Sequence, residues 1–350
     1  MNDLERSVLA AIAWFDLFDY PLTGWEVEKW QIDNRNGGAH SVRPNVGAID
    51  DRPYSDVMSA LQNLVDEKKL ARKWGYYFLP GREEIIETRQ RRYLLAREKF
   101  ERARRVARWL RCVPFVRLVA VCNTLGYSNA AEESDIDLFL IVAPGKIWTA
   151  RGLCLVLLKL FHLRPLLVRF GALREERKDK IDLSFFVTDD ALSLTSLALR
   201  EEIPISNFQN QSPVSNNHFP TDPYLTYWLV QLTPLYDHGG VYEKFWKANE
   251  TLRAALSSAS PYDTSPLRAV SASLMSRLLQ EAFEFVFSGT RLESVLKSIQ
   301  KHIMPARIKD LAGYSDGVVV SDTVLKFHDI DRRAEYRRTW IERLRAFTSI

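Results

Sequence analysis

Two apolar segments that flank a short polar turn constrain the fold of this chain more than any other feature. Residues 116–121 read VRLVAV, and residues 136–142 read IDLFLIV. Asp135 and Asp137 stand at the head of the second segment and alternate with apolar residues. Because side chains in a strand alternate between faces, we expect both carboxylates on one face and the apolar side chains on the other. The pattern predicts two strands of a sheet with a pair of acids at its end.

The two acids are candidate ligands of a metal ion. Carboxylates side by side repel each other and lose solvation unless a cation lies between them. Mg²⁺ prefers oxygen ligands and is commonly shared between one or two carboxylates and the phosphates of a substrate. An Asp-x-Asp pair also occurs as solvated residues at the edge of a strand. The surrounding sequence therefore decides whether Asp135 and Asp137 form a Mg²⁺ site or are ordinary surface acids.

That surrounding pattern resembles the signature of the polymerase β-like nucleotidyltransferase superfamily. Its members carry a Gly-Ser pair after a first strand, then a helical turn, then Asp-x-Asp at the start of a second strand. Here ten residues separate Thr124 from Asp135, which is the family spacing, and the pair itself is Asn123-Thr124. In the family the glycine lets a phosphate approach the backbone and the serine hydroxyl contacts the triphosphate. The resemblance places nucleotide contacts at Asn123, Thr124 and Ser134.

The resemblance also implies a third carboxylate on a later strand. Asp182, in KIDLSFFV, is the well-placed candidate. Residues 113–203 would then form a nucleotidyltransferase catalytic domain in which Asp135, Asp137 and Asp182 are the catalytic residues and bind two Mg²⁺ ions. The implied reaction is in-line attack of a hydroxyl on the α-phosphorus of a nucleoside triphosphate, with release of pyrophosphate.

The first 88 residues have the pattern of a separate module. Apolar residues recur at helical spacing from Leu4 to Phe15, and Thr23-Gly24-Trp25-Glu26 has the form of a capping box that opens a second helix. A third helix is expected from about Ser55, and two short strand-like runs turn at Gly75. Three helices and a hairpin predict a winged helix-turn-helix. This order resembles modules fused to nucleotidyltransferase domains in some prokaryotic proteins.

A basic segment connects this module to the predicted catalytic domain. Residues 89–111 contain nine arginines and Lys99 against Glu98 and Glu101, whereas the whole chain carries a net charge of only +4. Apolar residues on one helical face predict a connecting helix over residues 89–112 with a basic outer surface. That surface and the third helix of the winged helix make nucleic acid a candidate partner. A solvated linker helix is the alternative.

The rest of the chain, residues 204–350, is expected to be a helical C-terminal region. Two helices are predicted between residues 224 and 256, broken at a polar turn. His328, Asp329 and Asp331 match no metal-ligand spacing and are interpreted as an exposed tail that pairs its own charges. The predicted fold class is α+β: a winged helix-turn-helix, a mixed sheet with helices, and a helical C-terminal domain.

The sequence favours a cytoplasmic protein. Cys112, Cys122 and Cys154 lie far apart beside apolar neighbours, as expected of reduced thiols. The first residues include acids and an early Arg6 and do not indicate a signal peptide. The most apolar segment, residues 152–158, is much shorter than the roughly 20 residues that a bilayer requires. No membrane association is therefore expected.

Two functions from different classes fit these patterns. The first is a Mg²⁺-dependent nucleotidyltransferase that moves NMP from an NTP to a hydroxyl acceptor on a protein, a small molecule or a nucleic acid. The second is a catalytically weak or inactive nucleotidyltransferase fold that acts as a DNA-binding regulator. The three aspartates favour the first function, because three converging acids are costly to keep without a cation. Asn123 in place of glycine favours the second.

Overall fold

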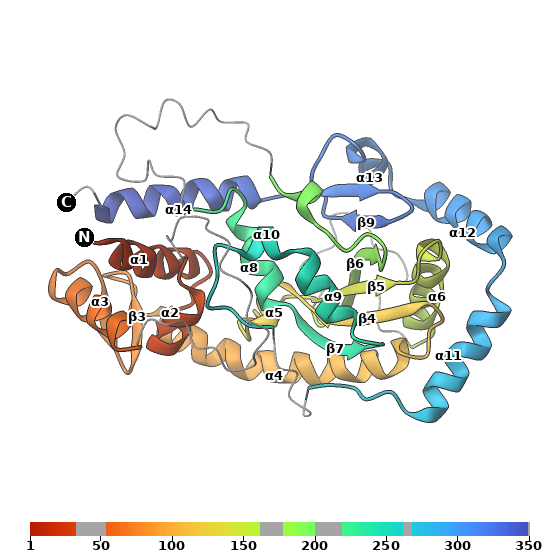
Figure 1. The fold of residues 1–350 in the computed structure, drawn as a ribbon, viewed down its shortest axis with the longest axis horizontal. Helices are drawn as coiled ribbons and strands as arrows, with labels where there is room; N and C mark the ends of the chain where they lie inside the picture. Colours follow the sequence, from red (N-terminus) through yellow and green to blue (C-terminus); the bar gives the residue numbers. More distant parts are fainter. Residues whose placement is uncertain (33–53, 162–177, 200–218, 262–267, 349–350) are drawn as a thin grey trace.

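A computed structural model of the chain describes residues 1–32, 54–161, 178–199, 219–261 and 268–348. The predicted boundary between residues 203 and 204 lies outside these residues. Within them the structure is a mixed α+β fold, as predicted: a six-stranded sheet in the order β7-β4-β5-β6-β9-β8 is flanked by helices, and a three-stranded sheet lies near the N-terminus (Figure 1).

The central sheet contains the predicted strands. Its members are β4 (Val116–Val121), β5 (Ile136–Val142), β6 (Ile181–Thr188), β7 (Thr233–Asp237), β8 (Val318–Val320) and β9 (Val324–Phe327). The β5–β6 pair is parallel and the other neighbouring pairs are antiparallel. A parallel pair needs a crossover, and the described part of the β5–β6 connection includes helix α6 (Ile147–Leu160).

Both faces of the sheet are covered, because residues along β5 alternate between two apolar cores. Leu138 and Leu140 pack in the core that includes side chains of α4 (Ile85–Leu110) and α6. Phe139 faces the opposite way, where its ring contacts Trp228 of α8 (Pro223–Gln231) and Phe245 of α9 (Val241–Ala248). The acids at the start of the strand are thus held by a strand that is buried on both sides.

The N-terminal region forms three helices and a small sheet. These elements are α1 (Asp3–Asp16), β1 (Leu22–Thr23), α2 (Gly24–Trp30), α3 (Tyr54–Asp66), β2 (Ala71–Lys73) and β3 (Tyr76–Phe78). The predicted capping box is present, since the Glu26 carboxylate accepts from the Thr23 backbone N–H while the Thr23 hydroxyl accepts from the Glu26 N–H. The predicted turn at Gly75 has φ +81°, which glycine adopts without strain.

This region shares its core with the C-terminal part of the chain. Residues Val8 to Phe15 of α1 are at most 2% exposed, because α1 packs between α3, α8 and α14 (Arg333–Thr348). Trp14 stacks on Tyr227 at 5.2 Å between ring centroids, and the Trp340 indole N–H donates to the Ala10 carbonyl at 2.9 Å. Figure 1 shows α1 running beside α14, with both termini at the same end.

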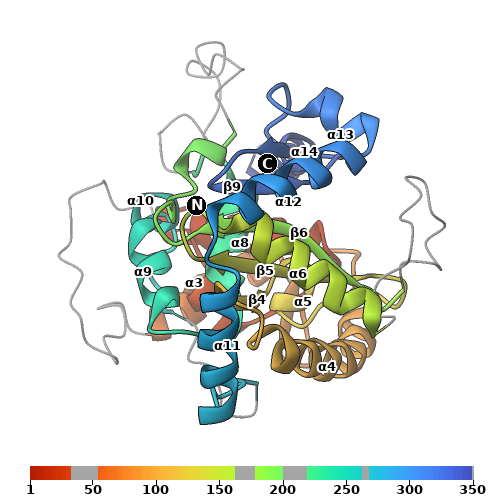
Figure 2. The same cartoon turned by 90° about the vertical axis from the view of Figure 1, so that its right-hand side faces the viewer.

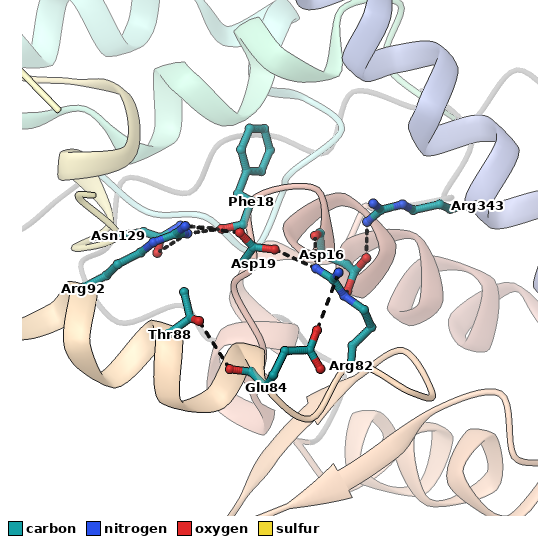
Figure 3. A network of polar contacts seen from close by, with 9 residues as sticks. All are labelled: Asp16, Phe18, Asp19, Arg82, Glu84, Thr88, Arg92, Asn129 and Arg343. Atoms are coloured by element: carbon teal, nitrogen blue, oxygen red, sulfur yellow. Dashed lines mark hydrogen bonds and ion pairs between the residues drawn. The ribbon is translucent and has the colours of Figure 1, made fainter. Parts of the chain in front are cut away.

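A polar network also joins these segments (Figure 3). The Asp16 carboxylate pairs with Arg82, at 3.2 Å, and with Arg343 of α14. Asp19 accepts from Arg82 at 2.7 Å and from Arg92 of α4 at 3.2 Å. The loop after α1 is therefore tied by arginines to both α4 and α14.

The C-terminal region is not purely helical, so that part of the prediction is wrong. Between residues 224 and 256, α8 is followed by strand β7, and only then by α9 and α10 (Glu250–Arg253). Pro234 concealed this strand in the sequence, since proline is tolerated only at sheet edges and β7 is an edge strand. Strands β8 and β9 are too short, at three and four residues, to show a clear alternation.

The remaining elements lie at the periphery. They are η1 (Thr195–Leu197), α11 (Leu274–Val286), α12 (Thr290–Ile303) and α13 (Ala306–Leu311). Seen from the side in Figure 2, α11 and α12 are in the foreground. No helix among the described residues is both long and apolar enough to cross a bilayer.

Candidate metal centre

Three aspartates converge at the start of two neighbouring strands. Asp137 and Asp182 are directly paired in the register of the parallel strands β5 and β6, and Asp135 lies two residues before Asp137. One carboxylate oxygen of each residue lies within 4.8 Å of one from each of the others. The structure therefore brings together the three acids that were predicted as metal ligands from two separate segments of the sequence.

The electrostatics of the cluster are unfavourable for negative charge. Burial raises the pKa of Asp137 well above its usual range, and the neighbouring carboxylates of Asp135 and Asp182 raise it further. The opposing contribution is a hydrogen bond, 2.7 Å long, that the Asn123 amide donates to the Asp137 carboxylate. Asp137 thus has a neutral hydrogen-bond partner and two acidic neighbours.

The donor set fits a hard divalent cation. Mg²⁺ binds oxygen ligands at about 2.1 Å, so two oxygens on opposite sides of one ion lie about 4.2 Å apart. Separations of up to 4.8 Å between the three carboxylates are on this scale. A cation here would also relieve the repulsion that raises the pKa of Asp137. The chemistry of the site therefore suits Mg²⁺, or another cation with a preference for carboxylates.

A buried lysine that the sequence did not single out fixes the loops before both strands. Lys99, on α4, is 3% exposed and donates to the Ser134 carbonyl at 2.5 Å. Its ammonium also pairs with Asp179 at 2.9 Å. The two loops meet again where the Ile136 N–H donates to the Lys180 carbonyl at 2.8 Å. Lys99 therefore holds together the segments that lead into Asp135 and Asp182.

Asn123 occupies a backbone conformation that explains its residue type. It begins the short helix α5 (Asn123–Gly126) with φ +56°, in the left-handed region where glycine and asparagine are favoured. Its side-chain oxygen accepts from the Trp228 indole N–H at 3.1 Å and from the Tyr224 hydroxyl at 3.4 Å. Asparagine thus adopts a backbone conformation that glycine would also adopt. Its side-chain amide links α8 to Asp137.

The other two predicted nucleotide contacts, Thr124 and Ser134, do not hydrogen-bond to the carboxylates as Asn123 does. Thr124, with Asn123, lines a cavity of about 30 Å³ whose other walls are mostly aromatic side chains of α1 and α8. A cavity of this size holds about one water molecule. The Ser134 hydroxyl donates to the Ala131 carbonyl at 2.9 Å, so it closes its own turn.

Asn123 also lines a second, larger cavity. Its volume is about 160 Å³, and Phe185, Trp228, Lys326 and His328 are among the side chains that line it. A ring nitrogen of His328, Nε2, lies 3.4 Å from the Ser184 hydroxyl, while Nδ1 has no hydrogen-bond partner among the described residues.

His328 is therefore not part of an exposed tail, as the sequence had suggested. It follows β9, and its side chain is largely enclosed next to β6. Burial, followed by the nearby charge of Lys326, lowers the pKa of His328 to about 4, so the ring is neutral at pH 7. The sequence held no signal for this position, because strand β9, which ends just before His328, is only four residues long. The tail prediction was partly right, since Asp331 does pair with Arg333 at 2.6 Å.

Comparison of the chain with models of protein families, with curated proteins and with solved structures found no match in any of the three.

Proposed function

We propose that the protein is a Mg²⁺-dependent nucleotidyltransferase that transfers NMP from an NTP to a hydroxyl acceptor and releases pyrophosphate. The convergence of Asp135, Asp137 and Asp182 carries this proposal. These residues would hold the metal, with two ions expected. Mg²⁺ bound there would stabilise negative charge on the phosphates and on the attacking and leaving oxygens. In finer terms, residues 113–203 are proposed to be the catalytic domain and residues 1–88 a winged helix-turn-helix.

The surrounding side chains suit such a site. Asn123 lines the 160 Å³ cavity, so a substrate group bound there would lie beside the residue that contacts Asp137. Trp228 and Phe185 offer apolar walls, and Lys326 adds a buried cation that also donates to the Asp316 carbonyl at 2.8 Å. A cation at the wall of a cavity favours a substrate group with negative charge.

A second candidate function is that of a regulator with little or no transferase activity, which binds DNA through the N-terminal region. The observation that favours it is that side chains already fill most of the space around Asn123 and Thr124. Trp228 and Tyr224 fix the Asn123 amide against Asp137, and only about 30 Å³ is open beside Thr124. A triphosphate at this turn would need α8 to move.

The basic helix α4 gives this second function limited support. Most of its cations have partners within the protein, such as Arg89 with Glu26 and Arg92 with Asp19. Arg91, Arg97, Arg105 and Arg108 make no ion pair among the described residues and are the cations most available to a phosphate backbone. Nucleic-acid binding would therefore be sensitive to salt but involve few phosphate contacts.

Incubation of the protein with each labelled NTP, Mg²⁺ and a cell extract tests the transferase function. Transfer of label to an acceptor, lost in Asp137→Ala and retained in a variant at the exposed Asp56, Asp56→Ala, is the expected result. Absence of label with wild type, or equal labelling by wild type and Asp137→Ala, would overturn the proposal. Tight, salt-sensitive duplex binding that is unchanged in Asp137→Ala would support the regulator instead.

A further inference from the structure

Helix α11 is amphipathic in the reverse sense to an ordinary surface helix. Its two buried residues are Ser276 and Gln280, whereas its large apolar side chains point outward. A surface helix normally turns its apolar stripe toward the core and its polar side chains toward water. The outer face of α11 is therefore built like a face that another surface covers.

The inner side of α11 is fixed to the sheet by polar side chains. The Gln280 amide donates to the Val116 carbonyl at 2.8 Å, and its oxygen accepts from the Tyr236 hydroxyl at 3.2 Å. The Glu284 carboxylate accepts from Arg117 at 2.7 Å and from the Phe115 N–H at 2.8 Å. These specific contacts set the rotation of the helix, so its apolar stripe cannot turn inward without breaking them.

Helix α12 repeats the arrangement. Glu293 accepts from the Trp148 and Thr149 N–H groups at the start of α6, at 2.9 and 2.8 Å, and the Gln300 amide donates to the Trp148 carbonyl at 2.7 Å. The outer side of α12 carries apolar residues at every fourth position. Both helices lie in the foreground of Figure 2, one after the other along the same side of the molecule.

We define the α11–α12 stripe as nine side chains that are between 42% and 84% exposed: Leu274, Met275, Leu278, Leu279, Phe285, Val286, Val295, Ile299 and Ile303. If a side chain of this size presents on the order of 150–200 Å² when fully exposed, the stripe exposes roughly 900 Å² of surface. The largest apolar patch of a typical monomer is about 300–600 Å². Each partner in a standard stable interface contributes about 800 Å². The stripe is thus large for a monomer and sufficient for a dimer.

We propose that the α11–α12 stripe is the interface of a homodimer in which two copies of α11 pack antiparallel about a two-fold axis. The charges beside the stripe favour a second copy as the occupant. Arg277 and Glu281 are both exposed and lie four residues apart, on one edge of the stripe. A two-fold axis reverses the partner helix, so Arg277 of each copy faces Glu281 of the other. The same patch is then complementary to itself, as a two-fold interface requires.

Sedimentation velocity of the full-length protein over a wide concentration range tests the proposal. We expect wild type to be a dimer. Leu278→Glu, in the middle of the stripe, should raise the dissociation constant by roughly thirtyfold or more, which corresponds to about 2 kcal/mol. The matched control is Leu94→Glu on α4, where Leu94 is 64% exposed and outside the stripe; it should remain dimeric. Circular dichroism checks that both variants stay folded.

Three outcomes would overturn this interface: a wild type that is monomeric at every concentration, a Leu278→Glu variant that dimerises like wild type, or a Leu94→Glu variant that dissociates equally. A charge exchange tests the antiparallel arrangement. Arg277→Glu alone should weaken the dimer by about fivefold, and the double variant Arg277→Glu with Glu281→Arg should restore it. A double variant as weak as the single one would overturn the antiparallel pairing.

Discussion

Two aspartates of this protein, the buried Asp16 and the partly exposed Asp137, lie in opposite electrostatic surroundings. Burial raises the pKa of both. At Asp16 this increase is opposed by Arg343 and Arg82, which pair with the carboxylate (Figure 3). At Asp137 the neighbouring groups act in the same direction as burial, because they are carboxylates. Arginines of the chain itself offset part of the effect of burial at Asp16, whereas neighbouring carboxylates disfavour the charge of Asp137 further.

The difference separates a structural acid from a functional one. A buried carboxylate that serves only the fold is paired, since an isolated buried charge costs several kcal/mol. Asp16 follows this rule and ties α1 to α14. Asp137 is held instead beside two other acids by the register of β5 and β6, an arrangement that becomes favourable when an external cation is added. The contrast can be tested by treating the two residues identically.

The largest expected effect is on metal binding, after the same carboxylate-to-amide change at each position. Asp137→Asn should lower the affinity for Mg²⁺ at least about a hundredfold, since it removes a charged ligand. Asp16→Asn should leave that affinity unchanged but lower the free energy of unfolding by about 1–2 kcal/mol, because Arg343 loses its charged partner and Arg82 loses one of three. Calorimetric titration with Mg²⁺ and denaturant unfolding measure the two quantities. Loss of Mg²⁺ binding in a folded Asp16→Asn variant would contradict the distinction.

The next effect concerns Lys99, the buried cation that contacts the loops leading into the carboxylate cluster. Lys99→Met should lower the free energy of unfolding by about 3 kcal/mol, because Asp179 loses a partner that is only 3% exposed. It should also weaken Mg²⁺ binding, as the loop before Asp135 is released. The matched control is Lys178→Met, since Lys178 forms an exposed pair with Glu132 and should leave both quantities unchanged. If Lys99→Met and Lys178→Met changed stability and Mg²⁺ affinity equally, Lys99 would have no special role in positioning the loops.

The pH dependence of stability should distinguish Asp137 from Asp16 in metal-free protein. With its pKa raised well above the usual range, folded Asp137 keeps a proton that the unfolded chain releases. The stability from this group is complete below the unfolded value of about 3.9 and is lost as pH rises through the raised value. Relative to Asp137→Asn, wild type should therefore lose up to about 1.4 kcal/mol per pH unit across this range.

Urea unfolding at a series of pH values, with a chelator and then with Mg²⁺, measures this loss. The chelated protein should show it, and Mg²⁺ should suppress it, because the bound cation favours the ionised carboxylate. For Asp16, whose arginines limit the increase in pKa, the same comparison with Asp16→Asn should give a smaller loss over a narrower range. A difference between wild type and Asp137→Asn that does not change with pH would contradict the raised pKa.

What the sequence predicted and what it missed have a common physical cause. Strands β4, β5 and β6 are six to eight residues long and mostly apolar, so their pattern predicted the strands and, with them, the positions of the acids. Lys99 was assigned to a basic helix, because only the folded chain shows that Asp179, eighty residues later, meets it. His328 was likewise placed by pairing between distant strands. Local pattern predicts an element, but partners that are distant in sequence depend on the tertiary packing.

The smallest expected effect is at Asn123, which joins the cluster of acids to the aromatic side chains of α8. Asn123→Gly fits the backbone, because φ is +56°, and removes the amide that competes for the Asp137 carboxylate. Loss of one such hydrogen bond should raise the affinity for Mg²⁺ about threefold to tenfold. Ser128→Gly, also at a left-handed position, is the control and should have no effect. Lower affinity in Asn123→Gly would instead mean that the amide orients Asp137 for the metal. If only Asn123→Gly transferred label from an NTP, the native asparagine would be what keeps this carboxylate site inactive.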